Sequence, residues 1–273
     1  MKVASSIILC FINFSLLAQN MVEGIIKDSD TKNPIPYVNI GIVKKSIGTV
    51  SDSEGKFELK FPSTLENDTI KISSIGYQSK SILVKDFLSR LQTNSIIELL
   101  PEVIELNEVL VSNKKLKEKI LGTKTKSRMF GNGFSNAPLG CEFGLKIKIK
   151  GSPTYIKKFH AHISSNTSRK TKFRLNFYNI KDGLPNEKIV YENIIFSIGP
   201  QEGKFTLDLE QYNIIVEEDF YCTIELVENQ QSGEEIFFSA KFLGKTTAYR
   251  WTSQAEWQKN GKIGVGFNYT VEY

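Results

Sequence analysis

His160 and His162 are the two histidines of the 273-residue chain. They lie two residues apart in a run with strand character, so both imidazoles would project from the same face of a strand. Two such rings could hold a transition metal if a neighbouring strand added a third ligand. No third ligand is identifiable, which favours two exposed strand histidines. The pair is kept as a weak binding candidate, and no metal is expected.

Trp251 and Trp257 are the two tryptophans, and they are the side chains best suited to stacking on a sugar ring, since aromatic platforms suit that task. Packing in a core or at an interface is the commoner role of tryptophan. Both residues are kept as weak binding candidates, with both roles open.

Carboxylates gather at Glu217, Glu218 and Asp219, between two expected strands. As the acid and base of a glycan hydrolase they would need a cleft that raises one pKa, whereas a turn needs nothing more. The run 28–30, Asp-Ser-Asp, offers oxygen ligands for weak calcium binding, but it also fits a plain connecting loop. We favour the turn and the loop.

Motifs of known chemistry are missing from the sequence. It has no Gly-x-Ser-x-Gly elbow, no P-loop, no Gly-x-Gly-x-x-Gly after a strand and no His-Glu-x-x-His. The histidines also lack an identifiable serine and aspartate for a triad. No catalytic residue and no cofactor is therefore expected, and the sequence alone assigns no reaction.

The elements that must position these residues are strands, beginning with the stretch 33–61. Asp52 can accept hydrogen bonds within its own turn, and Gly55 can take a positive φ. Apolar and charged residues then alternate, which predicts a half-buried strand over 56–61. One helical turn, Asp86 to Leu91, is expected with Asp86 as its cap. The other strands expected in this part of the chain are 22–27, 36–43, 47–51, 68–74, 79–84 and 95–99.

Four ordered motifs in this part of the chain resemble the carboxypeptidase regulatory-like domain. They are Gly24-x-x-x-Asp28, Pro34-Ile35-Pro36-Tyr37-Val38-Asn39-Ile40, Asp52-x-x-Gly55-x-Phe57 and Ser74-Ile75-Gly76-Tyr77. The resemblance covers about residues 21–112. It implies a transthyretin-like or Ig-like β-sandwich without catalytic residues, similar to the module in front of TonB-dependent outer-membrane receptors. The run Val103 to Val111 resembles the strand before the plug of those receptors, but no plug or large barrel follows.

The second half of the chain repeats the period-two pattern about ten times. Expected strands fall over 142–150, 155–164, 173–178, 188–198, 203–209, 212–217, 220–228, 235–242, 246–252 and 263–273. Short strands separated by turns predict an antiparallel, jelly-roll-like sandwich, and the fold class is therefore all-β. Residues 173–185 also resemble secreted jelly-roll modules related to carbohydrate-binding domains. A small outer-membrane barrel is a second alternative, because the alternation continues to Tyr273, although most runs are short for barrel strands.

Charge and hydropathy divide the chain further. Residues 1–19 read as a signal peptide, and Cys10 is taken as a residue of that leader. Residues 20–112 would be the first sandwich, 113–135 a basic linker with one or two helical turns between Lys114 and Leu121, and 136–273 the second sandwich. The stretch 129–140 reads as a loop. The net charge of +5 comes from this connector, which argues against a nucleic-acid-binding face.

Removal of the leader leaves Cys141 and Cys222 as the remaining cysteines. An oxidising compartment permits a disulfide between them, and the alternative is two separate buried thiols. Both remain open at the level of the sequence.

These features predict an exported, non-catalytic protein of the periplasm, the outer-membrane surface or the extracellular space. The expected role is binding of a glycan or of another envelope protein, with no nucleic-acid partner and no transmembrane helix once the leader is removed. The alternative is a glycan-acting hydrolase that uses carboxylates on the jelly-roll face.

Overall fold

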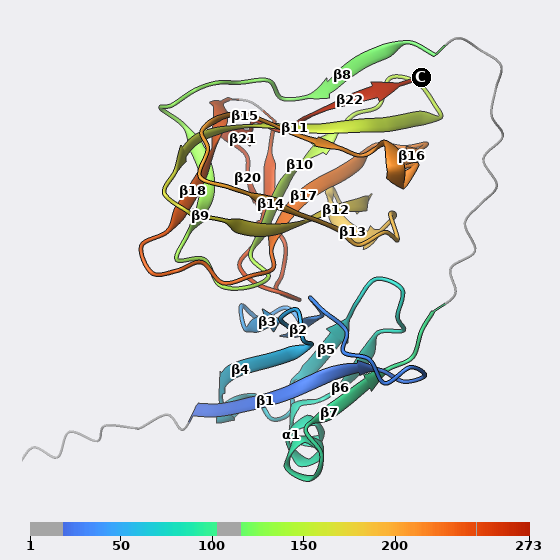
Figure 1. Cartoon of the computed structure of the whole chain (residues 1–273), viewed down its shortest axis with the longest axis vertical. Coiled ribbons are helices and arrows are strands. Elements are labelled where there is room, and N and C mark those ends of the chain that lie inside the picture. Colours follow the sequence, from blue (N-terminus) through green and yellow to red (C-terminus); the bar gives the residue numbers. More distant parts are fainter. Residues whose placement is uncertain (1–18, 103–115, 244) are drawn as a thin grey trace, which may run out of the picture.

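The computed structural model describes residues 19–102, 116–243 and 245–273. Its strands fall into two groups, which we call the N-terminal unit (residues 19–102) and the C-terminal unit (residues 116–273) (Figure 1). The expected leader, except for Gln19, and the expected strand over 103–111 lie outside the described residues. The predicted domain boundaries stay predictions.

The N-terminal unit consists of two small sheets with strand orders β4-β1-β7 and β3-β2-β5-β6. All described pairings in it are antiparallel except that of β1 with β7, which is parallel. The elements are β1 (Gln19–Asp28), β2 (Asn39–Ile42), β3 (Gly48–Val50), β4 (Lys56–Pro62), a 3-10 turn (Ser63–Leu65), β5 (Thr69–Ser73), β6 (Lys80–Leu83), α1 (Val84–Thr93) and β7 (Ile96–Leu99).

Strand β4 has the half-buried pattern that its sequence predicts. Phe57, Leu59 and Phe61 are buried. Lys56, Glu58 and Lys60, which alternate with them, face solvent. The preceding turn is also confirmed, because Asp52 Oδ1 accepts the N–H groups of Glu54 and Lys56 at 2.8 and 2.9 Å. Gly55 adopts φ +73°, which favours glycine.

Two expectations in this unit are wrong in detail. The helix is a full element, Val84–Thr93, rather than one turn, and its cap position is Leu83, with no side-chain capping bond from Asp86. Val84 and Phe87 are buried, so packing rather than a cap stabilises the helix. The strand expected from residue 36 begins at Asn39, because Tyr37 adopts φ +55° and interrupts the extended backbone.

The C-terminal unit consists of two larger sheets. The seven-stranded sheet has the order β13-β12-β17-β10-β19-β20 with β14 beside β12, and the eight-stranded sheet has the order β21-β18-β11-β22-β8 with β15, β16 and β9 attached. The elements are β8 (Glu118–Gly122), β9 (Gly131–Ser135), β10 (Glu142–Ile147), β11 (Thr154–Asn166), β12 (Thr171–Lys181), β13 (Leu184–Lys188), β14 (Ile194–Ile198), β15 (Gly203–Asp208), a 3-10 turn (Glu210–Tyr212), β16 (Ile215–Val216), β17 (Phe220–Leu226), β18 (Glu235–Phe242), β19 (Thr247–Arg250), β20 (Gln258–Asn260), β21 (Ile263–Val265) and β22 (Asn268–Glu272).

Phenylalanine dominates the core between these two sheets. Phe143 and Phe173 of the first sheet contact Phe238 of the second, with ring centroids 6.2 and 6.3 Å apart. Phe143 also stacks on Phe267, which lies between β21 and β22, at 5.9 Å. The predicted all-β class is confirmed, with mainly antiparallel sheets packed as sandwiches. No helix within the described residues has the length and apolar character needed to cross a bilayer.

Part of the expected linker belongs to the second sheet of this unit. The helical turns expected up to Leu121 are wrong, because β8 pairs with β22. The loop expected over 129–140 is also wrong in part, since β9 pairs with β18. A Cβ at Gly133 would collide with the backbone of Ile236 and the ring of Phe237. The glycine therefore permits close approach of the two strands rather than marking a loop.

The two remaining cysteines are separate thiols. Cys141 and Cys222 are free and buried, so the disulfide alternative is wrong in this structure. Burial, with Glu142 nearby, raises the pKa of Cys141 to about 12, and burial likewise raises the pKa of Cys222. Both behave as small apolar side chains of low reactivity.

Candidate functional site

The N-terminal unit contacts the outer face of the seven-stranded sheet through residues 37–41, next to and within β2 (Figure 1). Arg174 of β12 donates to Asn39 Oδ1 at 2.6 Å and also to the Tyr37 carbonyl. Asn39 Nδ2 donates to Ser253 Oγ at 2.9 Å, and Lys172 Nζ donates to the Tyr37 hydroxyl at 2.8 Å. The unusual backbone of Tyr37 thus presents its carbonyl group to the other unit.

Beneath this contact lies a buried set of charged and polar side chains, which we call the interface cluster. Arg174 and Glu225 form an ion pair at 3.3 Å with side chains only 2% and 0% exposed. Asn39 Nδ2 also donates to Glu225. The members of the cluster are Asn39, Glu142, Arg174, Asn176, Glu225 and Arg250.

A second ion pair completes the interface cluster. Arg250 contacts Glu142 at 2.5 Å, and Glu142 is fully buried. Asn176 Nδ2 links the two carboxylates, because it donates to Glu142 at 2.8 Å and to Glu225 at 2.9 Å. Each buried carboxylate therefore has both an arginine and an amide donor, which offsets the cost of its burial.

The electrostatics of the cluster follow from burial and from its cations. Burial opposes the charged form of Glu225, but Arg174, Lys188 and Arg250 outweigh it and hold the pKa of Glu225 below its ordinary value. Burial and the neighbouring Arg174 lower the pKa of Lys188 to about 7. The neighbouring cations therefore favour the ionised form of Glu225, whereas burial favours the neutral form of Lys188.

The hydrolase alternative needs two carboxylates that face a substrate. Glu142 and Glu225 do face each other across Asn176, yet both are fully buried and paired with arginine. A substrate would reach Glu225 only after Asn39 and the rest of the N-terminal unit moved away. In this arrangement Glu225 accepts a hydrogen bond from Asn39 of the N-terminal unit, whereas Glu142 is bonded within the C-terminal unit.

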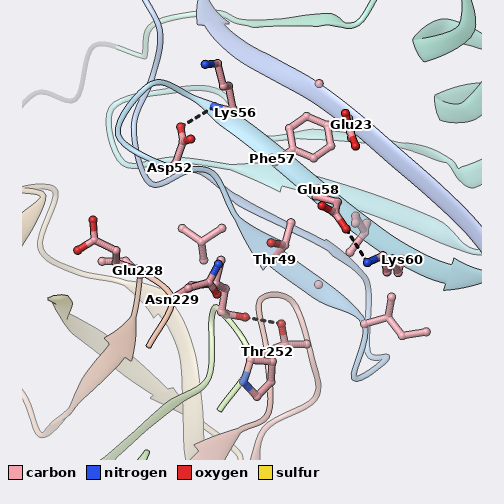
Figure 2. Close-up of a pocket in the computed structure, with 18 of the residues that line it drawn as sticks. Glu23, Thr49, Asp52, Lys56, Phe57, Glu58, Lys60, Glu228, Asn229 and Thr252 are labelled. Carbon is pink, nitrogen blue, oxygen red and sulfur yellow. Dashed lines mark hydrogen bonds and ion pairs between the residues drawn. The ribbon is translucent and has the colours of Figure 1, made fainter. Parts of the chain in front are cut away.

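A groove with a volume of about 1040 Å³ opens between the units beside this contact. One wall consists of β1, β3 and β4, and the other of residues 138–139, 227–229 and Thr252. Figure 2 shows Glu58 and Lys60 on the first wall and Glu228, Asn229 and Thr252 on the second. The two walls thus come from parts of the chain that are remote in sequence.

The walls of this interunit groove offer main-chain and charged groups. Among the described strands, β4 pairs only with β1 and β3 only with β2, so each has a free edge. Phe57, the one aromatic lining residue, is 5% exposed. Four acidic and two basic side chains line the groove: Glu23, Asp52, Glu58, Glu228, Lys56 and Lys60.

The histidines, predicted as a weak binding pair, lie on the eight-stranded sheet, away from the groove. His160 is buried, and its ring nitrogens contact the hydroxyls of Thr206 and Thr270 at 2.9 and 2.8 Å. Burial, with Lys204 nearby, lowers its pKa. His162 Nδ1 contacts Ser239 at 2.9 Å. Among the described residues, no group of three or more His, Cys, Asp or Glu side chains could hold a metal.

The two tryptophans have different surroundings. Trp257 packs edge-on against Tyr178, with centroids 5.6 Å apart, and its ring lies 4.8 Å from the guanidinium carbon of Arg250. Trp257 therefore covers Arg250 of the interface cluster. Trp251 is 53% exposed and meets Tyr249 edge-on at 6.0 Å, so it alone of the two is open to a ligand. Neither lines the groove.

The remaining acidic candidates are used locally. Asp28 Oδ1 accepts the N–H groups of Asp30 and Thr31, both at 2.8 Å, and its Oδ2 accepts the Tyr77 hydroxyl at 3.0 Å. Asp219 accepts the N–H of Ile149 at 3.1 Å, and Glu217 and Glu218 are exposed. These contacts agree with the loop and turn roles.

The interface cluster was not among the sites predicted from the sequence. Alternation over the expected strand 173–178 places Arg174 and Asn176 on the face opposite its apolar residues, and this pattern is typical of a solvent-exposed face. One signal was available, since Glu142, Arg174, Glu225 and Arg250 alternate with apolar residues on four expected strands. Nothing in the sequence shows that the other unit covers this face.

The contact between Asp28 and Tyr77 joins two of the motifs that carry the family resemblance, and the comparison with known families agrees. Residues 22–111 match the CarboxypepD_reg-like domain. The matched family consists of non-catalytic, regulatory-like domains of the Ig type. The remainder of the chain lies outside the match.

The chain is also similar to the TonB-dependent receptor SusC of Bacteroides thetaiotaomicron, at 28% identity over 115 residues. The alignment covers 42% of this chain and 11% of the receptor, so the chain matches only a small part of that relative's length. Together, the two matches indicate an envelope-associated module.

Gly41 of β2 allows a direct test of the contact between the units. A Cβ at Gly41 would collide with the Ser253 carbonyl, and its nearest neighbours all belong to the C-terminal unit. We expect Gly41→Ala to weaken the contact between the two units by about 1–3 kcal/mol of free energy. The radius of gyration measured by small-angle X-ray scattering should then increase. Gly199→Ala, where a Cβ meets nothing within 4 Å, is the control. Equal radii for both variants would contradict the contact.

Proposed function

We propose that this chain is an exported, non-catalytic envelope protein and that its interunit groove binds an extended polypeptide segment of another envelope protein. The observation that carries the proposal is the free edge of β4, which lines a groove with walls from both units. An edge strand presents unpaired N–H and C=O groups, and an added strand satisfies them.

The chemistry of the walls supports a polypeptide over a glycan. Sugar rings are held by stacking on exposed aromatic faces, whereas Phe57 is buried in the N-terminal core. The acidic surplus of the lining favours a segment with lysine or arginine. Glu58 pairs with Lys60 at 2.7 Å and Glu228 with Lys172 at 3.0 Å. Exposed pairs of this kind contribute about 0–1 kcal/mol each, so they can exchange partners.

Glycan binding is the second candidate, on the exposed Trp251. Its ring and that of Tyr249 meet at 84°, so they form a corner against which one sugar ring could stack. This site lies on the C-terminal unit outside the groove, and the two candidates therefore respond to different substitutions.

Site-specific photo-crosslinking in cells tests the first candidate. A photoreactive residue at Glu58, which is exposed in the groove, is expected to capture a polypeptide, whereas one at Lys85, exposed on α1, is not. A purified segment of the captured protein should then bind the full chain roughly tenfold more weakly after Glu58→Lys with Glu228→Lys.

Two outcomes would overturn this assignment. Equal crosslinking at Glu58 and Lys85 would show that the groove has no specific occupant. Binding to a glycan array that is abolished by Trp251→Ala and unchanged by Glu58→Lys, without groove crosslinks, would favour the second candidate.

A further inference from the structure

A second, smaller pocket lies at the opposite end of the outer face that carries the interface cluster. Its volume is about 300 Å³. Glu142 at the start of β10 belongs to the cluster, whereas the pocket begins at Lys146, near the end of the same strand. It shares no lining residue with the interunit groove. Besides Gly183, Tyr221 and Thr246, it is lined by Lys146, Lys148, Lys245 and Lys259.

The sheet brings these four lysines together from separate segments. Alternation along β10 buries Leu145 and Ile147 and turns Lys146 outward, and Lys148 is exposed directly after the strand ends. Lys245 lies two residues before β19, which pairs with β10, and Lys259 lies on β20, which pairs with β19.

The turn between β12 and β13 forms the opposite side of the pocket. The Tyr221 hydroxyl donates to the Gly183 carbonyl at 2.9 Å, which fixes this turn. A Cβ at Gly183 would lie 2.9 Å from Lys259 Nζ, so the ammonium group sits directly over the glycine. The pocket is therefore a defined hollow with basic groups on several sides.

One carboxylate faces this basic group of residues. Asp219 Oδ2 lies 3.1 Å from Lys146 Nζ, while its other oxygen accepts the Ile149 N–H. Among the described residues, no ion pair joins the other three lysines to a carboxylate. Burial and the ammonium groups of Lys148 and Lys150 lower the pKa of Lys245, against the effect of Asp219. Crowded ammonium groups in a partly desolvated hollow repel one another, and a bound anion would relieve that repulsion.

We propose that this pocket binds a phosphate or sulfate ester group carried by a larger molecule. A tetrahedral oxyanion accepts charge-assisted hydrogen bonds from several lysines at once. The hollow admits the ester group, and its open side leaves room for the molecule that carries the group. This site is independent of the groove and of its proposed polypeptide occupant.

Isothermal titration calorimetry on the full chain tests the site with inorganic phosphate, inorganic sulfate, glucose 6-phosphate and glucose 6-sulfate. We expect saturable binding that weakens as ionic strength rises. Lys245→Gln and Lys259→Gln should each weaken it roughly tenfold. The affinities for glucose 6-phosphate and glucose 6-sulfate show which ester the pocket prefers, and glucose alone should not bind.

Lys170→Gln is the matched control, because Lys170 is exposed and lies outside both pockets. It should leave the affinity unchanged, and thermal unfolding should show that all three variants are folded. Weakening by Lys170→Gln equal to that by Lys245→Gln would mean a general charge effect and would overturn the proposal. Absence of saturable binding up to about 1 mM ester would also overturn it. Neither result would alter the groove crosslinks.

Discussion

Arg174→Met is expected to lower the free energy of unfolding by about 3–5 kcal/mol, because it leaves a buried carboxylate without its cation. Glu225 is fully buried and pairs with Arg174 at 3.3 Å. The substitution also removes the hydrogen bonds from Arg174 to Asn39 and to the Tyr37 carbonyl. Urea titration followed by tryptophan fluorescence measures the loss, and a wider scattering profile would show separation of the units.

The loss of stability caused by Arg174→Met should depend on pH. The pKa of Glu225 is held below its ordinary value in the fold, so its contribution is present above the unfolded pKa of about 4.3. That contribution is lost as the pH falls through the folded pKa. The difference between the wild type and Arg174→Met should therefore shrink in acid, where a protonated Glu225 needs no cation.

Two further variants make the Arg174 result specific. Arg90→Met, at an exposed position on α1, should change the free energy of unfolding by less than about 0.5 kcal/mol. Arg174→Met combined with Glu225→Leu should recover part of the loss, since no unpaired charge remains. A loss for Arg90→Met as large as that for Arg174→Met would refute the role of the buried pair.

Phe134→Ala is expected to lower the free energy of unfolding by about 3–5 kcal/mol, the usual range for the loss of a fully buried phenylalanine ring. Phe134 of β9 is 0% exposed and lies between Phe143 and Phe173, with ring centroids 4.8 and 5.0 Å away. Removal of its ring would leave a cavity between the two sheets of the C-terminal unit. Chemical denaturation of the full chain provides the measurement.

Met129→Ala is the control for this prediction, because Met129 is 83% exposed in the same stretch of sequence. It should change stability by less than about 0.5 kcal/mol. If residues 129–135 were a linker, the two variants would behave alike. Equal and small effects would therefore contradict the assignment of β9 to the core.

The groove and the lysine pocket give the two sides of the molecule different chemistry. The groove has an acidic surplus and a free strand edge, whereas the pocket gathers four lysines on a face of the C-terminal unit. A basic polypeptide segment and an anionic ester would therefore not compete. Each proposal can fail without the other.

Local sequence patterns predicted much of the fold. The alternation from Lys56 to Phe61, the turn at Asp52 and Gly55, and the four family motifs predicted the N-terminal unit, because each depends on neighbours a few residues apart. The same patterning predicted the strands and the all-β class of the C-terminal unit. It missed β8 and β9, since short strands with glycine or lysine resemble a loop or linker until their partners are known.

The candidate sites were less accessible to sequence reasoning. Trp251, Trp257, His160 and His162 were chosen by residue type, yet the structure places three of them in packed or hydroxyl-bonded positions. The burial of Arg174 and Glu225 could not be predicted, because alternation distinguishes the two faces of a strand but does not show what covers each face.

By itself, the sequence determined the all-β class, most strands and the resemblance of residues 21–112 to the carboxypeptidase regulatory-like domain, since these depend on local periodicity and turn chemistry. Only the tertiary structure decided that Asn39 covers Glu225, that a groove opens beside this contact and that four lysines converge. Asn39 and Glu225 are 186 positions apart in the chain, and such contacts form only when separate sheets pack together.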